Sequence, residues 1–226
     1  ASDVYKRQTT KLRVIGGHQQ MMRLDFEETG PVPEREEARL IQKAEKSLAA
    51  GAQAVILSDY GKGACTAGVC TAVIAAAHHH GVPVVVDPKG GDWGRYRGAD
   101  YITPNLRELN EVQREAAANE DGAVESAARY ALRRFHIKAM VATRSERGLS
   151  LIKPRSAVHI PTKAQEVFDV SGAGDTVIAV FALALAGGLS PTDSAYLANV
   201  AAGVVVGKLG TYAVSREELL TALARL

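Results

Sequence analysis

The chain has little net charge and no long apolar run, and each shortage excludes a class of protein. Its 226 residues hold 27 lysines and arginines against 25 aspartates and glutamates, a formal charge of only +2. This balance argues against a nucleic-acid partner recognised through bulk charge. The longest apolar run, residues 177–186, is too short to cross a bilayer, and no signal peptide is visible. We therefore expect a cytoplasmic protein with no membrane partner.

Cysteine is also scarce, since only Cys65 and Cys70 occur. They are five positions apart in a segment that we predict to be helical, which suits neither a zinc site nor a short-range disulfide. We expect two small core residues of a protein in a reducing compartment.

Two familiar nucleotide-binding motifs are absent. The chain has no Gly-x4-Gly-Lys-Ser/Thr, which excludes a P-loop protein, and residues 172–174 lack the third glycine of the dinucleotide fingerprint and come late. The 46% hydrophobic content is enough for one sizeable core, so we predict one domain over residues 9–226. Residues 1–8 show no periodic pattern, and we set them aside as a non-native or unstructured head.

Apolar strands alternate with amphipathic helices, which predicts an α/β fold with a buried, mostly parallel sheet. A hairpin at residues 10–14 and 21–26 comes first, joined near Gly16 and Gly17. The expected later strands are 54–57, 82–86, 101–103 and 139–143, with an antiparallel pair at 149–153 and 157–160. The expected helices are 34–50, 66–80, 106–112, 122–135, 174–186, 191–208 and 215–225.

Polar residues gather where four of these strands end, at residues 58–63, 87–90, 103–108 and 143–148. Ligands of such sheets bind outside the carboxyl ends of the strands, so we expect an active-site rim there. Lys62 and Lys89 could each contact an anion or be ordinary surface lysines. Arg144 and Arg147 could meet a nucleotide phosphate or be solvated.

The most informative stretch is residues 168–176, FDVSGAGDT, which precedes an apolar run. Residues 172–174 would lie at a helix N-terminus, where unpaired N–H groups and the helix dipole favour a bound phosphate. Asp175 would hold a carboxylate beside that phosphate, where it could accept a proton from an attacking hydroxyl. The alternative is an ordinary helix start in which Asp175 only complements the dipole.

Asn105 and Glu108 form a second motif, three positions apart on one helix face. They could hold Mg²⁺ through water, or contact phosphate oxygens. They could also form a capping box, and both roles could hold together.

These two motifs, Asn-x-x-Glu and the late Asp-x-x-Gly-Ala-Gly-Asp-Thr of residues 169–176, resemble the ribokinase/PfkB family of sugar kinases. Within that family, further stretches are similar to the D-glycero-β-D-manno-heptose 7-phosphate kinases: residues 10–14, 23–28, 57–60, 87–90, 95–98, 103–106, 143–146 and 202–211. The similarity runs from about Thr9 to the C-terminus.

The resemblance implies a three-layer, ribokinase-like αβα fold with helices on both faces of the sheet and a small β lid remnant. It implies ATP-dependent phosphorylation of the anomeric C1 hydroxyl of heptose 7-phosphate to the 1,7-bisphosphate, toward ADP-heptose and the lipopolysaccharide core. ATP, Mg²⁺ and a monovalent cation (K⁺) are the implied cofactors, and the full-length protein would be a homodimer.

The resemblance also assigns roles to residues. Asp175 matches the catalytic base, and Gly172, Ala173 and Gly174 match the anion hole. The nucleotide and its metal would meet Asn105, Leu106, Arg107, Glu108, Thr143, Arg144, Gly148 and Asn199. Glu108 and Asp169 would contact the metal ions, and the monovalent cation would lie near Asp169 and Gly210. Apart from the resemblance, we take Lys62, Lys89 and Arg13 as candidate contacts for the substrate.

The chain departs from the family pattern at its start. The family begins with a strand that carries an aspartate for the sugar, followed by a Gly-Gly-x-x-x-Asn motif, and nothing before Thr10 supplies either. We therefore expect a domain incomplete at its N-terminus, with little activity alone and an aggregation-prone sheet edge. The alternatives are another family member acting on a fructose phosphate or nucleoside, and an inactive nucleotide-binding fragment.

Overall fold

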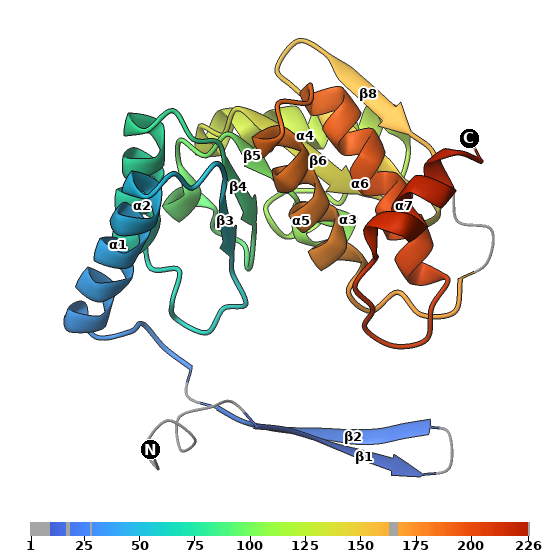
Figure 1. The fold of residues 1–226 in the computed structure, drawn as a ribbon, viewed down its shortest axis with the longest axis horizontal. Coiled ribbons are helices and arrows are strands. Elements are labelled where there is room, and N and C mark those ends of the chain that lie inside the picture. Colours follow the sequence, from blue (N-terminus) through green and yellow to red (C-terminus); the bar gives the residue numbers. More distant parts are fainter. Residues whose placement is uncertain (1–9, 17–18, 28, 163–166, 226) are drawn as a thin grey trace.

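The computed structural model describes residues 10–16, 19–27, 29–162 and 167–225. A six-stranded sheet lies between two layers of helices, and a two-stranded hairpin stands apart from them (Figure 1). The predicted α/β fold with helices on both faces of a mostly parallel sheet is confirmed. The segment 1–8 that the sequence sets aside lies outside the described residues.

The strands of the main sheet follow one another in chain order. Each strand pairs with the next: β3 (Val55–Ser58), β4 (Val84–Asp87), β5 (Tyr101–Ile102), β6 (Ala139–Thr143), β7 (Leu149–Ile152) and β8 (Ala157–Ile160). The pairs from β3 to β6 are parallel, and β6–β7 and β7–β8 are antiparallel. The expected antiparallel pair at the end of the sheet is confirmed.

The helices begin and end within two residues of their predicted bounds. They are α1 (Glu34–Ala49), α2 (Ala67–His79), α3 (Leu106–Glu111), α4 (Asp121–Phe135), α5 (Ala173–Ala186), α6 (Pro191–Val206) and α7 (Arg216–Leu223). Two short 3₁₀ helices, η2 (Gly94–Tyr96) and η3 (Ser145–Arg147), were not expected. A helix of three residues is too short to produce a periodic pattern that sequence analysis can recognise.

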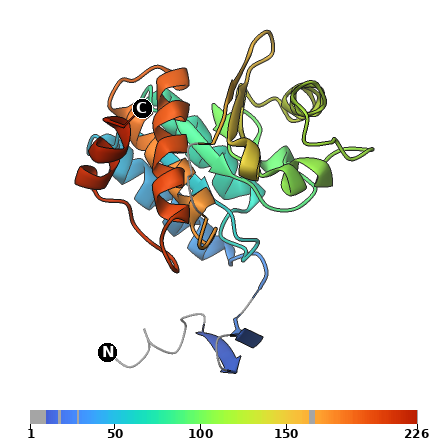
Figure 2. The same cartoon turned by 90° about the vertical axis from the view of Figure 1, so that its right-hand side faces the viewer.

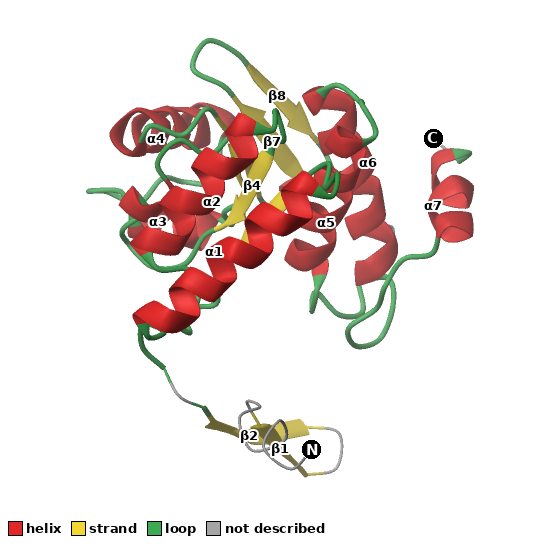
Figure 3. Ribbon diagram, turned by 60° about the vertical axis from the view of Figure 1, so that its left-hand side comes forward, coloured by secondary structure: helices red, strands yellow, loops and turns green. Residues whose placement is uncertain are grey.

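The core consists of two clusters, one on each face of the sheet. Val84 and Val86 of β4 pack into a cluster with α2 and α4, whereas Val85 packs on the other side with α5 and α6. Alternate side chains of a strand point to opposite faces, so a strand covered on both sides must be apolar throughout. Figure 3 shows α1 and α2 in front of the strands, with α5 and α6 beyond them.

The hairpin consists of β1 (Thr10–Gly16) and β2 (Gln19–Phe26), which are antiparallel as predicted. It projects from the body in both perpendicular views (Figures 1 and 2). Its base is held at the loop after β3, where the Val32 amide donates to the Gly63 carbonyl at 3.1 Å. Gly63 has φ +91°, and a Cβ there would collide with the Gly30 carbonyl, so only glycine suits this crossing.

Because β3 to β6 are parallel, their carboxyl ends meet at one edge of the sheet, as the sequence predicts. The N-terminus of α5 reaches the same edge, where Asp175 contacts Tyr60 from the loop after β3. Among the described residues, no helix combines the length and apolar character needed to cross a membrane.

Candidate active site

The N-terminus of α5 is shaped by a glycine in the left-handed region. Gly172 has φ 82° and ψ 0°, a conformation that glycine adopts at low cost. The helix is anchored behind it, because the amide and the hydroxyl of Thr176 both donate to the Gly172 carbonyl at 2.9 Å. Within the described parts of the chain, the amides of Gly174 and Asp175 have no acceptor. These two N–H groups are therefore available to an anion.

The Asp175 carboxylate is held by a tyrosine from a distant part of the chain. The Tyr60 hydroxyl donates to Asp175 Oδ1 at 2.9 Å across 115 residues of sequence. This bond, together with burial, raises the pKa of Tyr60, so the phenol stays protonated and remains a donor at neutral pH. Sequence reasoning did not single out Tyr60, although it lies within the polar strand end at 58–63.

Asp87, the last residue of β4, adds a further carboxyl group at this edge. Burial, together with the negative charges of Glu108 and Asp175, raises the pKa of Asp87 to about 7. Three carboxyl groups therefore repel one another across a small region, which favours a bound cation. The sequence places Asp87 at a strand end but gave no reason to prefer it over its neighbours.

The donor set at this edge fits a divalent cation that shares its ligands with a phosphate. In the part of the chain that the structure describes, no group of three or more His, Cys, Asp or Glu side chains could hold a metal alone. Mg²⁺ usually keeps several waters and binds one or two carboxylates together with substrate phosphates. The carboxylates of Asp87 and Glu108 match that requirement.

Asn105 and Glu108 form the capping box that the sequence predicts. The Glu108 amide donates to Asn105 Oδ1 at 2.9 Å, and the Asn105 amide donates to Glu108 Oε2 at 3.1 Å. The other carboxylate oxygen, Oε1, accepts from Lys89 Nζ at 3.2 Å. The capping alternative is therefore confirmed, while the metal role remains a prediction.

A cavity of about 520 Å³ lies beside the glycine-rich helix start. It brings together Thr143, Gly148 and Asn199, three of the residues expected at the nucleotide, with Ala173 and Gly174 of α5. The remaining lining residues are Ser145, Glu146, Leu149, Thr162, Val167, Val170, Val177, Ala202, Gly203 and Val206. A largely apolar cavity that opens toward free helix-terminal N–H groups has the form of a nucleotide site.

The turn between β6 and β7 forms one wall of this cavity and requires a glycine. Gly148 has φ 80°, and a Cβ there would overlap the backbone of Ile160 and Thr162. The Asn199 side chain, almost fully buried, donates to the Pro161 carbonyl at 2.8 Å and so joins α6 to the same wall.

Arg144 lies elsewhere than the sequence predicts. Its side chain is 1% exposed, so it is not solvated, and it does not line the cavity. The guanidinium is directed to Asp121 Oδ1 at 2.5 Å, Asn119 Oδ1 at 2.9 Å and Ser150 Oγ at 3.0 Å. A guanidinium group has five N–H donors, so a buried arginine needs several acceptors around it. Asn119, Asp121 and Ser150 supply them, and they draw the side chain away from the cavity. The backbone of Arg144 helps to close the turn beside the cavity, because its amide donates to the Gly148 carbonyl at 2.8 Å.

The predicted substrate contacts are spread over two regions. Lys62 pairs with Glu27 at the base of the hairpin, and both line a cavity of about 270 Å³ together with Tyr60. Lys89 pairs with Glu108, as described above. Arg13 lies on the exposed β1 strand directly opposite Arg23.

Leu106 and Arg107, which were expected near ATP, do not line the cavity, and neither do Asn105 and Glu108. The Leu106 side chain packs against the core, and Arg107 pairs with Glu111 one helical turn later at 3.7 Å. Both follow Asn105 in α3, and the helical rotation turns them away from the sheet edge.

Asp169 and the Gly210 region meet, as the resemblance implies. Asp169 accepts the Ser171 amide at 2.8 Å and the Gly210 amide at 3.2 Å. These hydrogen bonds, chiefly those with Ser171, lower the pKa of Asp169, so its carboxylate stays ionised. An ionised carboxylate in a loop fits a cation site, and the cation itself remains a prediction.

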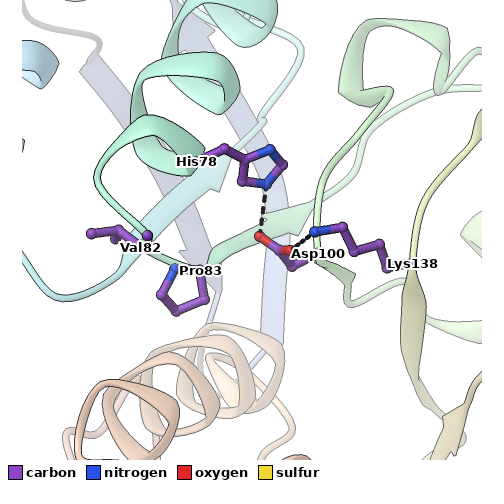
Figure 4. A pocket seen from close by; sticks show the side chains of 6 residues that line it. His78, Val82, Pro83, Asp100 and Lys138 are labelled. Carbon is purple, nitrogen blue, oxygen red and sulfur yellow. Dashed lines mark hydrogen bonds and ion pairs between the residues drawn. The ribbon is translucent and has the colours of Figure 1, made fainter.

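Another hollow, of about 460 Å³, lies at the opposite edge of the sheet (Figure 4). There Asp100 accepts from Lys138 Nζ at 2.6 Å, the Val84 amide at 2.9 Å and His78 Nε2 at 3.1 Å. These groups join the amino ends of β4, β5 and β6. Ligands of parallel sheets bind at the carboxyl ends, so we assign this cluster a structural role.

The sheet, its two helical layers and the site at the carboxyl edge define a ribokinase-like α/β fold. The chain superposes on phosphofructokinase-2 from Escherichia coli in complex with potassium with a TM-score of 0.75 and 18% identity, covering 90% of this chain and 66% of that one. It superposes on Arabidopsis thaliana ribokinase complexed with ribose and ATP with a TM-score of 0.69 and 20% identity, covering 89% and 65%. At such identities the likeness shows the fold alone.

The family model of the pfkB carbohydrate kinases matches residues 5–218, and the chain belongs to this family. It is 51% identical over 217 residues to the bifunctional protein HldE of Mesorhizobium japonicum, covering 96% of this chain and 43% of that protein. The corresponding protein of Erwinia tasmaniensis is 48% identical, covering 95% and 44%. The chain thus spans less than half the length of these curated relatives. The sugar-kinase family predicted from residues 169–176 is confirmed.

Proposed function

We propose that residues 9–226 form the kinase domain of a longer protein and transfer the γ-phosphoryl group of ATP to the anomeric C1 hydroxyl of D-glycero-β-D-manno-heptose 7-phosphate. The product is the 1,7-bisphosphate, which leads toward ADP-heptose and the lipopolysaccharide core. One observation carries the proposal: the Asp175 carboxylate lies in the first turn of α5, where it accepts a hydrogen bond from the Tyr60 hydroxyl and directly follows Gly174, which lines the cavity. The choice of heptose is supported by the similarity to the HldE proteins.

Asp175 acts as the general base in this proposal. A carboxylate at a helix N-terminus lies next to a phosphoryl group bound there. It can therefore accept the proton of the hydroxyl that attacks this phosphoryl group. An anomeric hydroxyl is more acidic than a plain alcohol, so a carboxylate is basic enough. Tyr60 holds the carboxylate in one orientation by its 2.9 Å hydrogen bond.

The start of α5 stabilises the charge that develops on the transferred group. The amides of Gly174 and Asp175 lack acceptors within the described chain, and the helix dipole points its positive end at them. Gly172 and Ala173 carry no bulky side chain, so a phosphate can approach the backbone closely. Most of the rate enhancement would come from this alignment and charge stabilisation.

ATP would occupy the 520 Å³ cavity with its base and ribose, between Thr143, Gly148 and Asn199, with its phosphates toward Gly174. Mg²⁺, when bound, would neutralise the phosphate charge, and we assign Asp87 and Glu108 as the carboxylates that would hold it. Asp169 would face a monovalent cation.

The sugar phosphate would bind between the sheet edge and the hairpin. Lys62 and Lys89 stand at two strand ends, and Arg13 projects from the hairpin, which would serve as a lid. Both lysines are paired with carboxylates, Glu27 and Glu108, so the substrate would have to displace or share these partners.

The test is ADP release coupled to NADH oxidation, with heptose 7-phosphate, fructose 6-phosphate and a nucleoside as acceptors. We expect the highest kcat/KM with heptose 7-phosphate. A preference for either other acceptor would assign the chain a different sugar or nucleoside kinase activity. Nucleotide binding by calorimetry without turnover on any acceptor, in both this chain and the longer protein, would favour the nucleotide-binding module.

A further inference from the structure

The two cysteines lie together at the start of α2, which differs from the expectation based on their spacing. The helix begins at Ala67, and its N-cap is Thr66, whose hydroxyl accepts the Val69 amide at 3.1 Å. Cys65 therefore precedes the cap, and Cys70 occupies the fourth helical position. Side chains at these two positions pack against each other in a hydrophobic staple. Two cysteines five residues apart can therefore lie close together when one precedes the N-cap of a helix and the other lies in its first turn.

Cys65 packs against the core cluster that contains Cys70, and the two thiols are near enough for each to shift the pKa of the other. Cys65 Sγ also lies 3.9 Å from the Ser58 carbonyl. Both cysteines are free thiols. A disulfide needs Cα atoms about 4.4–6.8 Å apart and sulfurs about 2.05 Å apart.

The two thiols differ in access and acidity. Cys65 is half-buried and lines the cavity at the base of the hairpin, whereas Cys70 is fully buried. The interaction with the Cys70 thiol lowers the pKa of Cys65, with a contribution from the nearby Arg95 guanidinium, against the opposing effects of burial and Asp59. The same interaction, followed by burial, raises the pKa of Cys70. The accessible thiol is therefore the better nucleophile.

We propose that Cys65 and Cys70 form a peroxide-reactive dithiol that closes reversibly to an intramolecular disulfide. The Cys65 thiolate attacks one oxygen of a hydroperoxide, the O–O bond breaks, and Cys65 becomes a sulfenic acid while the other oxygen leaves with a proton, as water or an alcohol. The Cys70 sulfur then attacks the Cys65 sulfur. The S–O bond breaks, the S–S bond forms, and the hydroxide leaves as water with the Cys70 proton. The peroxide is reduced, two thiols are oxidised, and an external dithiol reverses the reaction by exchange.

This chemistry would act on the loop that connects β3 to α2. The loop carries Tyr60 and Lys62, and the Arg95 guanidinium donates to the Cys65 carbonyl at 3.5 Å. A disulfide between Cys65 and Cys70 of α2 would restrain the end of this loop that precedes α2. The proposal does not depend on the proposed function, because it requires only the two sulfurs and an oxidant.

The chain has only two cysteines, so intact mass and thiol counting give an unambiguous test. The folded chain is treated with hydrogen peroxide, quenched with catalase, and labelled with a maleimide in denaturant. We expect both thiols to disappear together, a monomeric product lighter by two hydrogen atoms, and full recovery with dithiothreitol. Persistence of both thiols, or a product that runs as a disulfide-linked dimer, would overturn the proposal.

Single variants separate the two roles. In Cys70→Ser, peroxide should leave Cys65 as a sulfenic acid that dimedone traps. In Cys65→Ser, the buried Cys70 should label only after denaturation and react far more slowly with peroxide. Equal peroxide rates in the two variants would contradict the assigned order. Cys70→Ala, an apolar replacement for the buried thiol, repeats the trapping experiment if the serine variant does not fold, as judged by circular dichroism.

Discussion

The two sides of the candidate site are built differently. The proposed nucleotide side consists of α5, α6 and the β6–β7 turn, and its walls continue into a buried cluster that includes Ile178 and Phe181. The lid side is a hairpin attached by the Lys62–Glu27 ion pair and the Val32–Gly63 hydrogen bond. The hairpin exposes seven large apolar side chains: Leu12, Val14, Ile15, Met21, Met22, Leu24 and Phe26. A tightly packed wall holds its lining residues in fixed positions, whereas a hairpin attached by few contacts can move when a ligand binds.

The largest effect should follow from removing the base. Asp175→Asn keeps the shape of the helix start but cannot take a proton, so we expect kcat to fall by about 10²–10⁴-fold. Calorimetric affinity for ATP should be nearly unchanged, because the cavity walls are intact. Asp193→Asn, which alters an exposed first-turn aspartate of α6, is the matched control and should retain activity. Near-normal turnover of the Asp175 variant would refute the assignment of the base.

The packed wall should tolerate little change. Gly148→Ala combines a positive φ with an overlap onto the neighbouring backbone, so we expect a loss of about 2–6 kcal/mol in the free energy of unfolding and weaker ATP binding. Gly188→Ala has a similar φ of +84° but open space around it, and should cost only about 1–2 kcal/mol. Urea denaturation of the two variants separates overlap from backbone strain. Equal losses would mean that the turn relaxes freely.

The carboxyl cluster predicts a pH dependence of stability. The folded-state pKa of Asp87 is about 7, above the unfolded value near 3.8, so the folded state holds this proton more tightly. Its stabilising contribution is complete below the unfolded pKa and is lost as the pH rises through about 7. Asp87→Asn should remove this loss, so the free energy of unfolding of the variant should fall less than that of the unaltered chain between pH 4 and pH 8. Parallel pH profiles would contradict the assigned environment.

The smallest effect on stability should come from the lid attachment. Lys62→Ala removes a partly exposed ion pair, so the free energy of unfolding should change by less than about 1 kcal/mol. If the lysine contacts the sugar phosphate, KM for the sugar should rise roughly tenfold while ATP affinity stays constant. Lys43→Ala, on the exposed side of α1, is the control. An equal loss of ATP affinity would erase the distinction between the two sides.

The elements of the fold were predictable because local signals mark their ends. Gly51 and Gly81, for example, follow α1 and α2 with positive φ, and both helices end within two residues of the expected position. The family and the glycine-rich start of α5 were likewise visible, because the relevant residues are contiguous. The Asn105–Glu108 capping box was predictable for the same reason.

Contacts between distant segments were not predictable. The bond from Tyr60 to Asp175 and the raised pKa of Asp87 depend on how strands and helices assemble. From the sequence, the Arg144 side chain could point into the nucleotide site or away from it. Its direction is decided by the hydrogen-bond acceptors on α4 and β7, which only the folded chain brings close. The cysteine contact depended on the first residue of α2, and helix boundaries are the least certain part of a sequence-based expectation.

The strand order has a consequence for synthesis of the protein. In the six-stranded sheet, each strand from β4 to β8 pairs with the strand made immediately before it, so this sheet can grow while the chain leaves the ribosome. Its second face, which includes Val85 and Val141, stays uncovered until α5 and α6 emerge. We expect the nascent chain to need shielding from other proteins during that interval, which ends when α5 and α6, the helices beside the candidate site, are made.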